Sequence, residues 1–310
     1  MRRFWIDTDT ASDDAVAILM ALRTPDVHVE GISVVAGNIP VEMGARNARY
    51  TVELCGKDTP VYIGAEKPLQ REAHYAYFFH GPDGMGGMNF PEASLPVQPR
   101  HAVPAFIEAV RQYPGEITLV TLGPLTNMAL ALAQAPDIAA QIKDCYVMGG
   151  TANQVGNITP AAEFNIWFDP EAARMFFHSG VNFVMGGWEL CRHSAAITLE
   201  EIEMMRGFNN KFADFVININ ATATRINVET YGEPGMGLPD PISMAMAIDP
   251  GVMTRVSRHF TDVDTQSELS RGATIVDELN VMGKPANAGV CWSIDEPRWK
   301  ENLFKTIRQA

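Results

Sequence analysis

The chain has 310 residues, 46% of them hydrophobic, and a net charge of −13 from 24 lysines and arginines against 37 aspartates and glutamates. This length and composition are those of a globular protein with a substantial core. The negative charge argues against binding to nucleic acid or to an anionic membrane, so we expect a small-molecule ligand. No apolar run approaches the roughly 18 residues of a membrane span, and no signal-peptide core precedes the first strand pattern, which predicts a cytoplasmic protein.

The segment 4–18 holds the most informative pattern of the sequence. Phe4 to Ile6 form a short apolar run typical of a strand. The apolar residues that follow recur at helical spacing and predict a helix that begins near Ser12, its expected N-cap, and ends at Thr24.

Four carboxylates lie between this strand and the first turn of this helix: Asp7, Asp9, Asp13 and Asp14. Like charges at this spacing repel one another and raise each other's pKa unless a cation neutralises them. Capping of the helix would use one carboxylate and not four. The pattern therefore indicates a site for a hard, oxygen-binding cation, Ca²⁺ or Mg²⁺.

Apolar runs rich in β-branched residues alternate along the chain with helical patterns. We expect strands at 29–35, 61–63, 117–122, 145–148 and 181–185, and helices at 102–112, 125–134, 170–178 and 242–248. Such alternation is typical of right-handed βαβ units, and it predicts an α/β protein with an open, mostly parallel, doubly wound sheet flanked by helices. Because no linker or repeat divides the sequence, we expect one domain over residues 1–310.

Polar residues follow several of the predicted strands, at the edge where sheets of this kind bind their ligands. Asn38 follows one strand, the Gly-Pro-Leu-Thr-Asn segment at 123–127 follows another, and Met148 ends a third. Asp240 stands at a predicted helix start, where capping is the simple explanation. Counted with the first cluster, it becomes the best candidate to complete a metal site from the far side.

Two loops are unusual. The glycine-rich loop 80–87, which begins at His80, is either a mobile flap over the crevice or a plain surface loop with a solvated histidine. The second loop places Asn157, Glu163 and Asn165 in an apolar stretch, where the hydroxyls of a sugar would satisfy them if they are buried. Turn formation and helix capping are the alternative roles for the two asparagines.

Taken together, these motifs resemble the inosine-uridine-preferring nucleoside hydrolase family. The opening Asp-Thr-Asp-Thr-Ala-Ser-Asp-Asp-Ala is similar to that family's Asp-x-Asp-Pro-Gly-x-Asp-Asp-Ala signature. The segments at 123–127, 148–150, 156–157 and 163–165 have family counterparts in the same order. The resemblance implies an N-glycosidase of purine or pyrimidine nucleoside metabolism that releases ribose and the free base. It also implies a homodimer or homotetramer.

The resemblance assigns roles to individual residues. It implies one Ca²⁺ held by the carboxylates of Asp9, Asp14 and Asp240 and by the main-chain carbonyl of Thr126. Asp9 would also be the general base that activates a calcium-bound water. Substrate contacts are expected from the following residues: Asp13, Asn38, His80, Met148, Asn157, Glu163 and Asn165.

The sequence departs from the family pattern at Pro239, where well-studied members of one branch carry a histidine that protonates the leaving base. Proline cannot donate a proton, so activation of the leaving base falls to another donor such as His80 or Tyr231, to solvent, or to stacking on aromatic groups. Thr10 and Ala11 replace the usual Pro-Gly, which changes the turn and leaves the carboxylates in place.

Three other functions fit parts of the sequence. A haloacid-dehalogenase-type phosphatase would explain Asp7 and Asp9 by its Asp-x-Asp-x-Thr motif, but it leaves Asp13 and Asp14 without a role. A non-catalytic nucleoside- or sugar-binding protein of the same fold would bind ribose without turnover. A hydrolase of another ribosyl compound would keep the chemistry and change the substrate.

Overall fold

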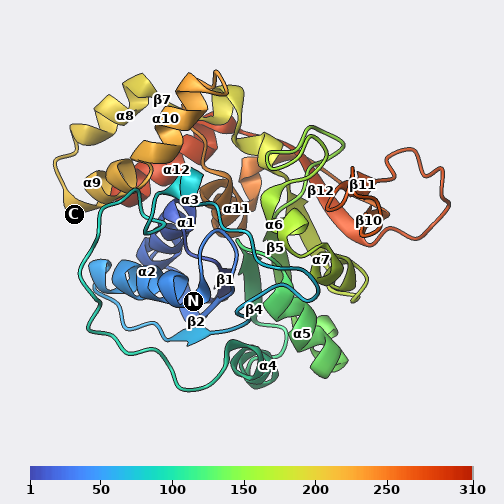
Figure 1. Ribbon diagram of the computed structural model, residues 1–310. Helices are drawn as coiled ribbons and strands as arrows, with labels where there is room; N and C mark the ends of the chain where they lie inside the picture. The colour runs from blue at the N-terminus through green and yellow to red at the C-terminus, as the bar shows by residue number, and fades with distance from the viewer. Residues whose placement is uncertain (309–310) are drawn as a thin grey trace.

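A computed structural model describes residues 1–308, and its centre is an eight-stranded sheet with helices on both faces (Figure 1). The strands follow the order β3-β2-β1-β4-β5-β6-β12-β9, and all neighbours are parallel except β12 and β9. Their bounds are β1 (Arg2–Thr8), β2 (Val27–Val34), β3 (Val61–Ile63), β4 (Ile117–Thr121), β5 (Asp144–Met148), β6 (Phe183–Gly186), β9 (Met253–His259) and β12 (Ala288–Ile294). Residues 309–310, which the predicted domain includes, lie outside the described part.

Shorter strands form two antiparallel pairs away from the main sheet: β7 (Ile197–Thr198) with β8 (Gly235–Met236), and β10 (Thr261–Val263) with β11 (Thr274–Val276). The α-helices are α1 (Ser12–Arg23), α2 (Val41–Leu54), α3 (Tyr77–His80), α4 (Ala102–Gln112), α5 (Thr126–Gln134), α6 (Phe164–Phe168), α7 (Pro170–Phe177), α8 (Leu199–Arg206), α9 (Lys211–Ile219), α10 (Ala221–Glu229), α11 (Pro239–Ile248) and α12 (Glu296–Arg308). Short 3₁₀ turns occur at η1 (Pro136–Gln141), η2 (Trp188–Cys191), η3 (His193–Ala195) and η4 (Pro250–Val252). Across residues 1–308 the helices are all too short or too polar to cross a membrane.

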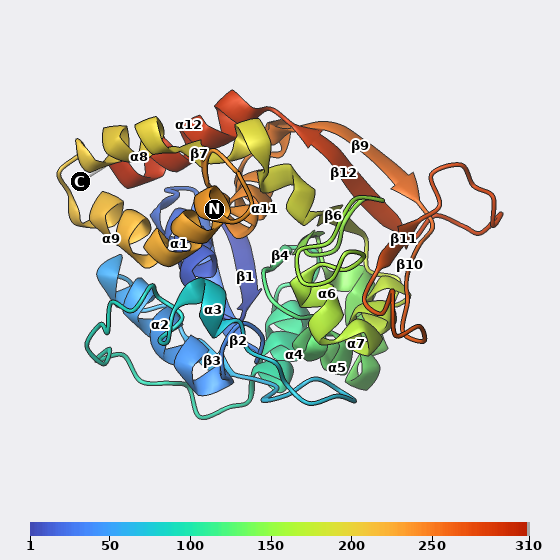
Figure 2. The ribbon, with the colours of Figure 1, turned by 45° about the horizontal axis from the view of Figure 1, so that its top comes forward.

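Both faces of the central strands are buried: successive residues of a strand point to opposite sides, and both sets are mostly apolar there. In β1, Phe4 and Ile6 belong to one hydrophobic cluster, and Trp5 between them belongs to the other. The first cluster includes side chains of α1, α2 and α11, and the second includes those of α4, α5 and α7 (Figure 2). This burial on two sides explains why the strands read as almost continuous apolar runs.

The strand order places the ligand-binding edge. From the centre, β1 is followed outward by β2 and β3 on one side, and β4 is followed by β5 and β6 on the other. The chain therefore reverses its direction across the sheet between β1 and β4, and a crevice opens outside the carboxyl ends of strands at such a point. Asp9 follows β1 directly and Leu122 follows β4 directly, so both lie at this edge.

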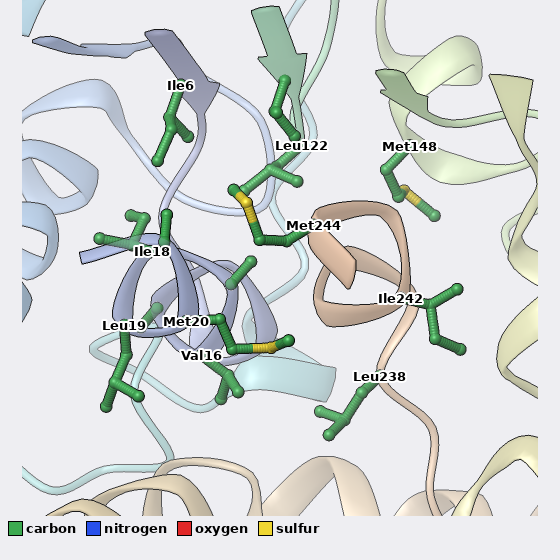
Figure 3. Close-up of a cluster of buried hydrophobic side chains, with 14 of the residues drawn as sticks. Ile6, Val16, Ile18, Leu19, Met20, Leu122, Met148, Leu238, Ile242 and Met244 are labelled. Atoms are coloured by element: carbon green, nitrogen blue, oxygen red, sulfur yellow. The ribbon is translucent and has the colours of Figure 1, made fainter. Parts of the chain in front are cut away.

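Helices α1 and α11 pack against each other beneath the same edge. Figure 3 shows Met20 of α1 and Ile242 and Met244 of α11 in a cluster that also contains Ile6 of β1 and Leu122. Both helices carry aspartates in their first turns, where free backbone N–H groups favour negative charge. The apolar contact between the two helices thus joins segments of the chain that are more than 200 residues apart.

The helix predicted from Ser12 to Thr24 is α1, but the expected N-cap is wrong. Ala11 occupies the N-cap position, and its N–H donates to Oδ2 of Asp14 at 3.0 Å. Ser12 is the first helical residue, and its Oγ lies 2.8 Å from Nδ1 of His80. The Asp14 carboxylate, three residues after the N-cap, thus makes the contact at the start of the helix that was expected from Ser12. A bond from the N-cap N–H to an acidic side chain at this position is one half of a capping box.

The glycine-rich loop does not hold a solvated histidine. His80 ends α3 and is only 5% exposed. The loop is organised by the carboxylate of Asp83, which accepts hydrogen bonds from the N–H groups of Met85, Gly87 and Asn89 at 2.7 to 2.9 Å. Three inward N–H donors around one buried carboxylate give a glycine-rich segment a defined shape without regular secondary structure.

Gly123→Ala should destabilise the protein and displace Asp9. A Cβ at position 123 would lie 2.8 Å from the backbone nitrogen of Asp9 and 2.9 Å from its Oδ1. The backbone of Asp9 would have to shift to accept this methyl group. We therefore expect a loss of about 1–3 kcal/mol in the free energy of unfolding, measured in urea. Gly207→Ala is the control, since its Cβ would meet only a carbonyl oxygen at 3.2 Å in a right-handed helical conformation. Equal stability of the two variants would contradict the close packing on Asp9.

Candidate active site

A cavity of about 870 Å³, measured to its open mouth, lies at the carboxyl edge of the sheet. Its depth can be read from the exposure of its lining: Asp13 and Asp240 are at most 9% exposed, whereas Phe78 and Tyr231 are 61% and 47% exposed. The cavity thus has an acidic, buried floor and an aromatic mouth.

The floor is built by carboxylates from three elements. Single carboxylate oxygens of Asp13, Asp14 and Asp240 lie within 4.8 Å of one another. Asp9 stands beside this group, fully buried, and the charges of Asp14 and Asp13 both act to raise its pKa. The structure therefore brings together all of the predicted acidic ligands, and it adds Asp13, which was expected to contact substrate instead.

These carboxylates lack a compensating positive charge in the fold itself. Burial raises the pKa of Asp9 and of Asp240 well above the usual range, and neighbouring aspartates add to the effect. Burial also raises the pKa of Asp13 to about 6. Within residues 1–308 the one ion-pair contact to this group is His80 Nδ1 with Asp13 Oδ1 at 3.7 Å, and burial lowers the pKa of His80 to about 4. His80 is therefore neutral near pH 7.

Some of the carboxylate oxygens are held by the protein and others are not. Asp14 accepts from Thr8 Oγ1 at 2.6 Å as well as from the α1 cap, and Asp9 Oδ2 accepts from the Asn38 N–H at 2.5 Å. Within the described chain, Asp9 Oδ1 and Asp13 Oδ1 are buried without a hydrogen-bond partner. Unpartnered buried carboxylate oxygens in a cluster that has only oxygen donors fit a hard divalent cation.

The second predicted loop supplies one wall of the cavity. Glu163 is the N-cap of α6: Oε1 accepts from the Asn165 N–H at 2.9 Å, and Oε2 accepts from the Gly150 N–H at 2.8 Å. Burial raises the pKa of Glu163 to about 7 in spite of these bonds. Capping of the helix that starts at Pro170 was the alternative considered for Asn165, but Asp169 caps that helix, with Oδ1 accepting from the Ala172 N–H at 3.1 Å. Asn157, whose Oδ1 accepts from the Phe164 N–H at 2.9 Å, fixes the start of α6.

Asn165 connects this wall to the strand ends. Its Nδ2 donates to the Leu122 carbonyl at 2.7 Å and lies 3.1 Å from the sulfur of Met148. Met148, Asn38, His80, Asn157, Glu163 and Asn165 all line the cavity, so the predicted substrate contacts converge there.

Thr126 is the predicted site residue that the structure sets apart. It begins α5, and its Oγ1 donates at 2.7 Å to Oδ2 of Asp169, a carboxylate outside the acidic cluster. Like the fully buried Asp9 and Asp14, it does not line the cavity. A carbonyl within a helix points along the axis toward the C-terminal end and accepts from the residue four positions later. The Leu122 carbonyl, at the end of β4 and on the cavity lining, is the main-chain oxygen better placed to face the floor.

The sequence analysis missed four residues of the cavity lining, which come from the segment after β6 and from the region of α10. Trp188 and Arg192 come from the turn η2 and its C-cap, and Asn227 and Glu233 come from α10 and the segment after it. The rule that ligands lie at strand ends would have pointed to Trp188 and Arg192, because β6 ends at Gly186. Asn227 and Glu233 follow no strand, and nothing in the local sequence marks them.

An acidic pocket at the reversal point of a parallel sheet is the arrangement of an α/β enzyme with a small-molecule substrate. The family model described as "Inosine-uridine preferring nucleoside hydrolase" matches residues 4–301. The chain belongs to this nucleoside hydrolase family, and the fold and activity that the resemblance implied are confirmed at that level.

Individual relatives agree with this assignment. The pyrimidine-specific ribonucleoside hydrolase RihA of a Shewanella species is 38% identical over 97% of this chain and 95% of its own length. A plant nucleoside hydrolase structure, PpNRh1, superposes with a TM-score of 0.94 at 29% identity and covers 100% of this chain and 99% of its own. The purine-preferring ribonucleoside hydrolase of Gardnerella vaginalis gives a TM-score of 0.91 at 29% identity, with 99% and 98% of the chains covered.

The acidic floor should make the metal-free protein more stable at lower pH. The folded-state pKa of Asp13, about 6, and of Glu163, about 7, exceed their unfolded values. For each group, the folded state binds more protons than the unfolded state at any pH between the unfolded and the folded pKa. The stabilising contribution is therefore greatest below the unfolded pKa, and it is lost as pH rises through the folded pKa. In the presence of a chelator we expect Tm to fall from about pH 6 to about pH 8, and added Ca²⁺ to raise Tm more at the higher pH.

Asp240→Asn is the control for this pH dependence. It removes one charge from the floor, so both the pH slope and the Ca²⁺ effect should shrink. A Tm that is insensitive to Ca²⁺ in the unaltered protein at about pH 8 would contradict the cation site.

Proposed function

We propose that the chain acts as one nucleoside hydrolase domain over residues 1–310 and uses a bound Ca²⁺ to split ribonucleosides into ribose and base. The observation that carries this proposal is the set of buried, uncompensated carboxylates at the floor of the cavity. The relatives are named for pyrimidine or for purine nucleosides, so their names leave the preferred base open.

Asp9, Asp14 and Asp240 are the proposed carboxylate ligands, and Leu122 replaces Thr126 as the proposed main-chain ligand. Oxygen ligands of this kind suit Ca²⁺, which takes six to eight of them. Asp13 lies within the same cluster, so it either adds a ligand or accepts a hydrogen bond from the sugar. When bound, the cation supplies positive charge and coordination positions for sugar hydroxyls and a water molecule.

Asp9 is the proposed general base. Its Oδ1 is buried and unpartnered, whereas Oδ2 is held by the Asn38 N–H, so one oxygen is oriented and the other is available for a proton. Cleavage of an N-glycosidic bond builds positive charge on the ribose ring. The carboxylates of the floor and the amide of Asn165 stabilise that charge, since they present oxygen atoms in a site of low dielectric constant.

The remaining predicted contacts fall into two groups. Asp13, Asn38, Asn157, Glu163 and Asn165 are proposed to bind the ribose hydroxyls, with the Met148 main chain nearby. His80 is held by Ser12 and is neutral, so it is proposed to contact substrate by hydrogen bonding and not as a cationic acid. We also propose a homodimer or homotetramer in the cytoplasm, where four free cysteines are usual.

Incubation with uridine, cytidine, inosine and adenosine tests the activity directly. Release of reducing sugar from at least one ribonucleoside is expected with Ca²⁺ and should stop on chelation. The matched 2′-deoxynucleoside should be a poor substrate, because it lacks a hydroxyl that the floor is proposed to bind. Nucleoside binding without any sugar release would favour the non-catalytic alternative.

Asp9→Asn should lower kcat by orders of magnitude while the protein remains folded, because the amide cannot take up a proton. The assay is single-turnover release of base, with Tm and the circular dichroism spectrum as checks of folding. Asp83→Asn is the comparison, since that carboxylate only holds the loop 80–87. Near-normal kcat in the Asp9 variant would refute the base role.

A further inference from the structure

We propose that Arg192 stabilises the departing base. It thereby activates the leaving group, which Pro239 cannot do because proline has no proton to donate. Arg192 is the one lysine or arginine among the described residues that line the cavity. This inference rests on the proposed function, because it concerns the leaving group of the same reaction.

The guanidinium group is held in place by two contacts that leave its far side free. Nε donates to Oε1 of Glu233 at 2.8 Å, and the group lies over the ring of Trp188 with 4.9 Å between Cζ and the centroid. Within residues 1–308, Nη1 and Nη2 have no hydrogen-bond partner. A planar cation that is fixed at Nε and on one face presents its remaining donors in a defined direction.

The anchors are themselves fixed. Glu233 is 8% exposed, and its Oε2 accepts from the His193 N–H at 2.7 Å, so the carboxylate cannot turn away from Arg192. Trp188 Nε1 donates to the Val155 carbonyl at 2.7 Å, which holds the ring beside the loop 151–158. Arg192 is thus held by two fixed partners while its Nη donors stay unused. This arrangement is typical of a ligand-binding side chain and not of a surface ion pair.

The position of Arg192 matches the leaving base and not the sugar. Its side chain is 23% exposed, whereas the side chain of Asp13 on the floor is 12% exposed. Tyr231, which also lines the cavity, is 47% exposed and marks the mouth. A nucleoside with its ribose on the acidic floor would therefore direct its base toward Arg192.

The chemistry of the departing base requires such a donor. When the C1′–N bond breaks, both bonding electrons pass to the base while the water oxygen bonds to C1′. The proton of the water goes to Asp9 and then to solvent, and the anionic base takes one proton from solvent. Arg192 transfers no proton, because its guanidinium stays protonated. It donates hydrogen bonds to a carbonyl oxygen that shares the negative charge, as in uracil or hypoxanthine.

Arg192→Met tests this role by comparison of two leaving groups. Uridine needs help to expel its base, whereas 4-nitrophenyl β-D-ribofuranoside releases a stable phenolate. We expect kcat/KM for uridine to fall about 10- to 100-fold more than kcat/KM for the phenolate substrate. Inosine should behave as uridine does, and adenosine, which has no carbonyl oxygen, should lose less.

Three variants separate the role of Arg192 from damage to the fold. Arg192→Lys keeps the charge without the fork of donors and should recover part of the uridine activity. Glu233→Gln should show the same substrate dependence in weaker form, since it loosens the guanidinium. Arg206→Met is the control and should leave both substrates unchanged, because that exposed arginine pairs with Glu203 and does not line the cavity.

The outcomes separate the two levels of the proposal. Equal losses on both substrates in Arg192→Met, or no loss on uridine, would overturn the role of Arg192 while the unaltered enzyme still hydrolyses both. Failure of the unaltered enzyme on every riboside would overturn the proposed function itself. If Arg192→Met does not fold, the same comparison of substrates is made with Arg192→Lys, and equal losses there overturn the inference.

Discussion

Repulsion among buried carboxylates is the constraint on which the site depends. Asp9, Asp14 and Asp240 are at most 3% exposed, and no lysine or arginine of the described chain pairs with them. The first turns of α1 and α11 each offset about 0.3–1 kcal/mol of this repulsion through the helix dipole. Burial of an ion costs several kcal/mol even after relaxation. The helix ends therefore cannot balance the cluster, and proton uptake or a cation must do so.

The surrounding fold is arranged to keep this unfavourable cluster in place. The packing of α1 on α11 is apolar and buried, so it stabilises the same approach of helix ends that the charges oppose. Glycines allow the strand ends to close in: a Cβ at Gly37 would meet Asp9 Oδ2 at 2.1 Å, and one at Gly44 would meet the Asp9 carbonyl at 2.9 Å. The precision of the floor thus depends on core contacts and on the absence of side chains beside Asp9.

The sequence predicts the elements whose signals are local and periodic. The strands at 61–63 and 117–122 and the helix at 102–112 are confirmed to within a residue. Asp240 could be linked to Asp9 because it is another carboxylate at a predicted helix start and because the family resemblance named it. The strands β12 and β9 at one end of the sheet and the helix α2 were not identified, although α2 carries a clear apolar face.

The other failures share one cause, which is competition between polar groups for the same backbone donors. Ser12 and Asp14 were both able to cap α1, and Asn165 and Asp169 were both able to cap α7. The choice depends on partners distant in sequence, His80 for Ser12 and Leu122 for Asn165. The role of the Thr126 carbonyl stays a prediction, since the exact start of α5 decides whether that oxygen faces the cavity or the helix axis.

The charged side chains of the cavity are arranged to match the charges that the proposed reaction creates on the sugar and on the base. Negative side chains occupy the floor, where the ribose ring would become positive, and Arg192 stands near the mouth, where the base would become negative. Because Glu233 neutralises much of the charge on Arg192, the benefit comes from directed hydrogen bonds rather than from net charge. Pro239 then carries no cost for catalysis: it occupies the first turn of α11, where proline's missing N–H is not needed, and it starts the helix that delivers Asp240 to the floor.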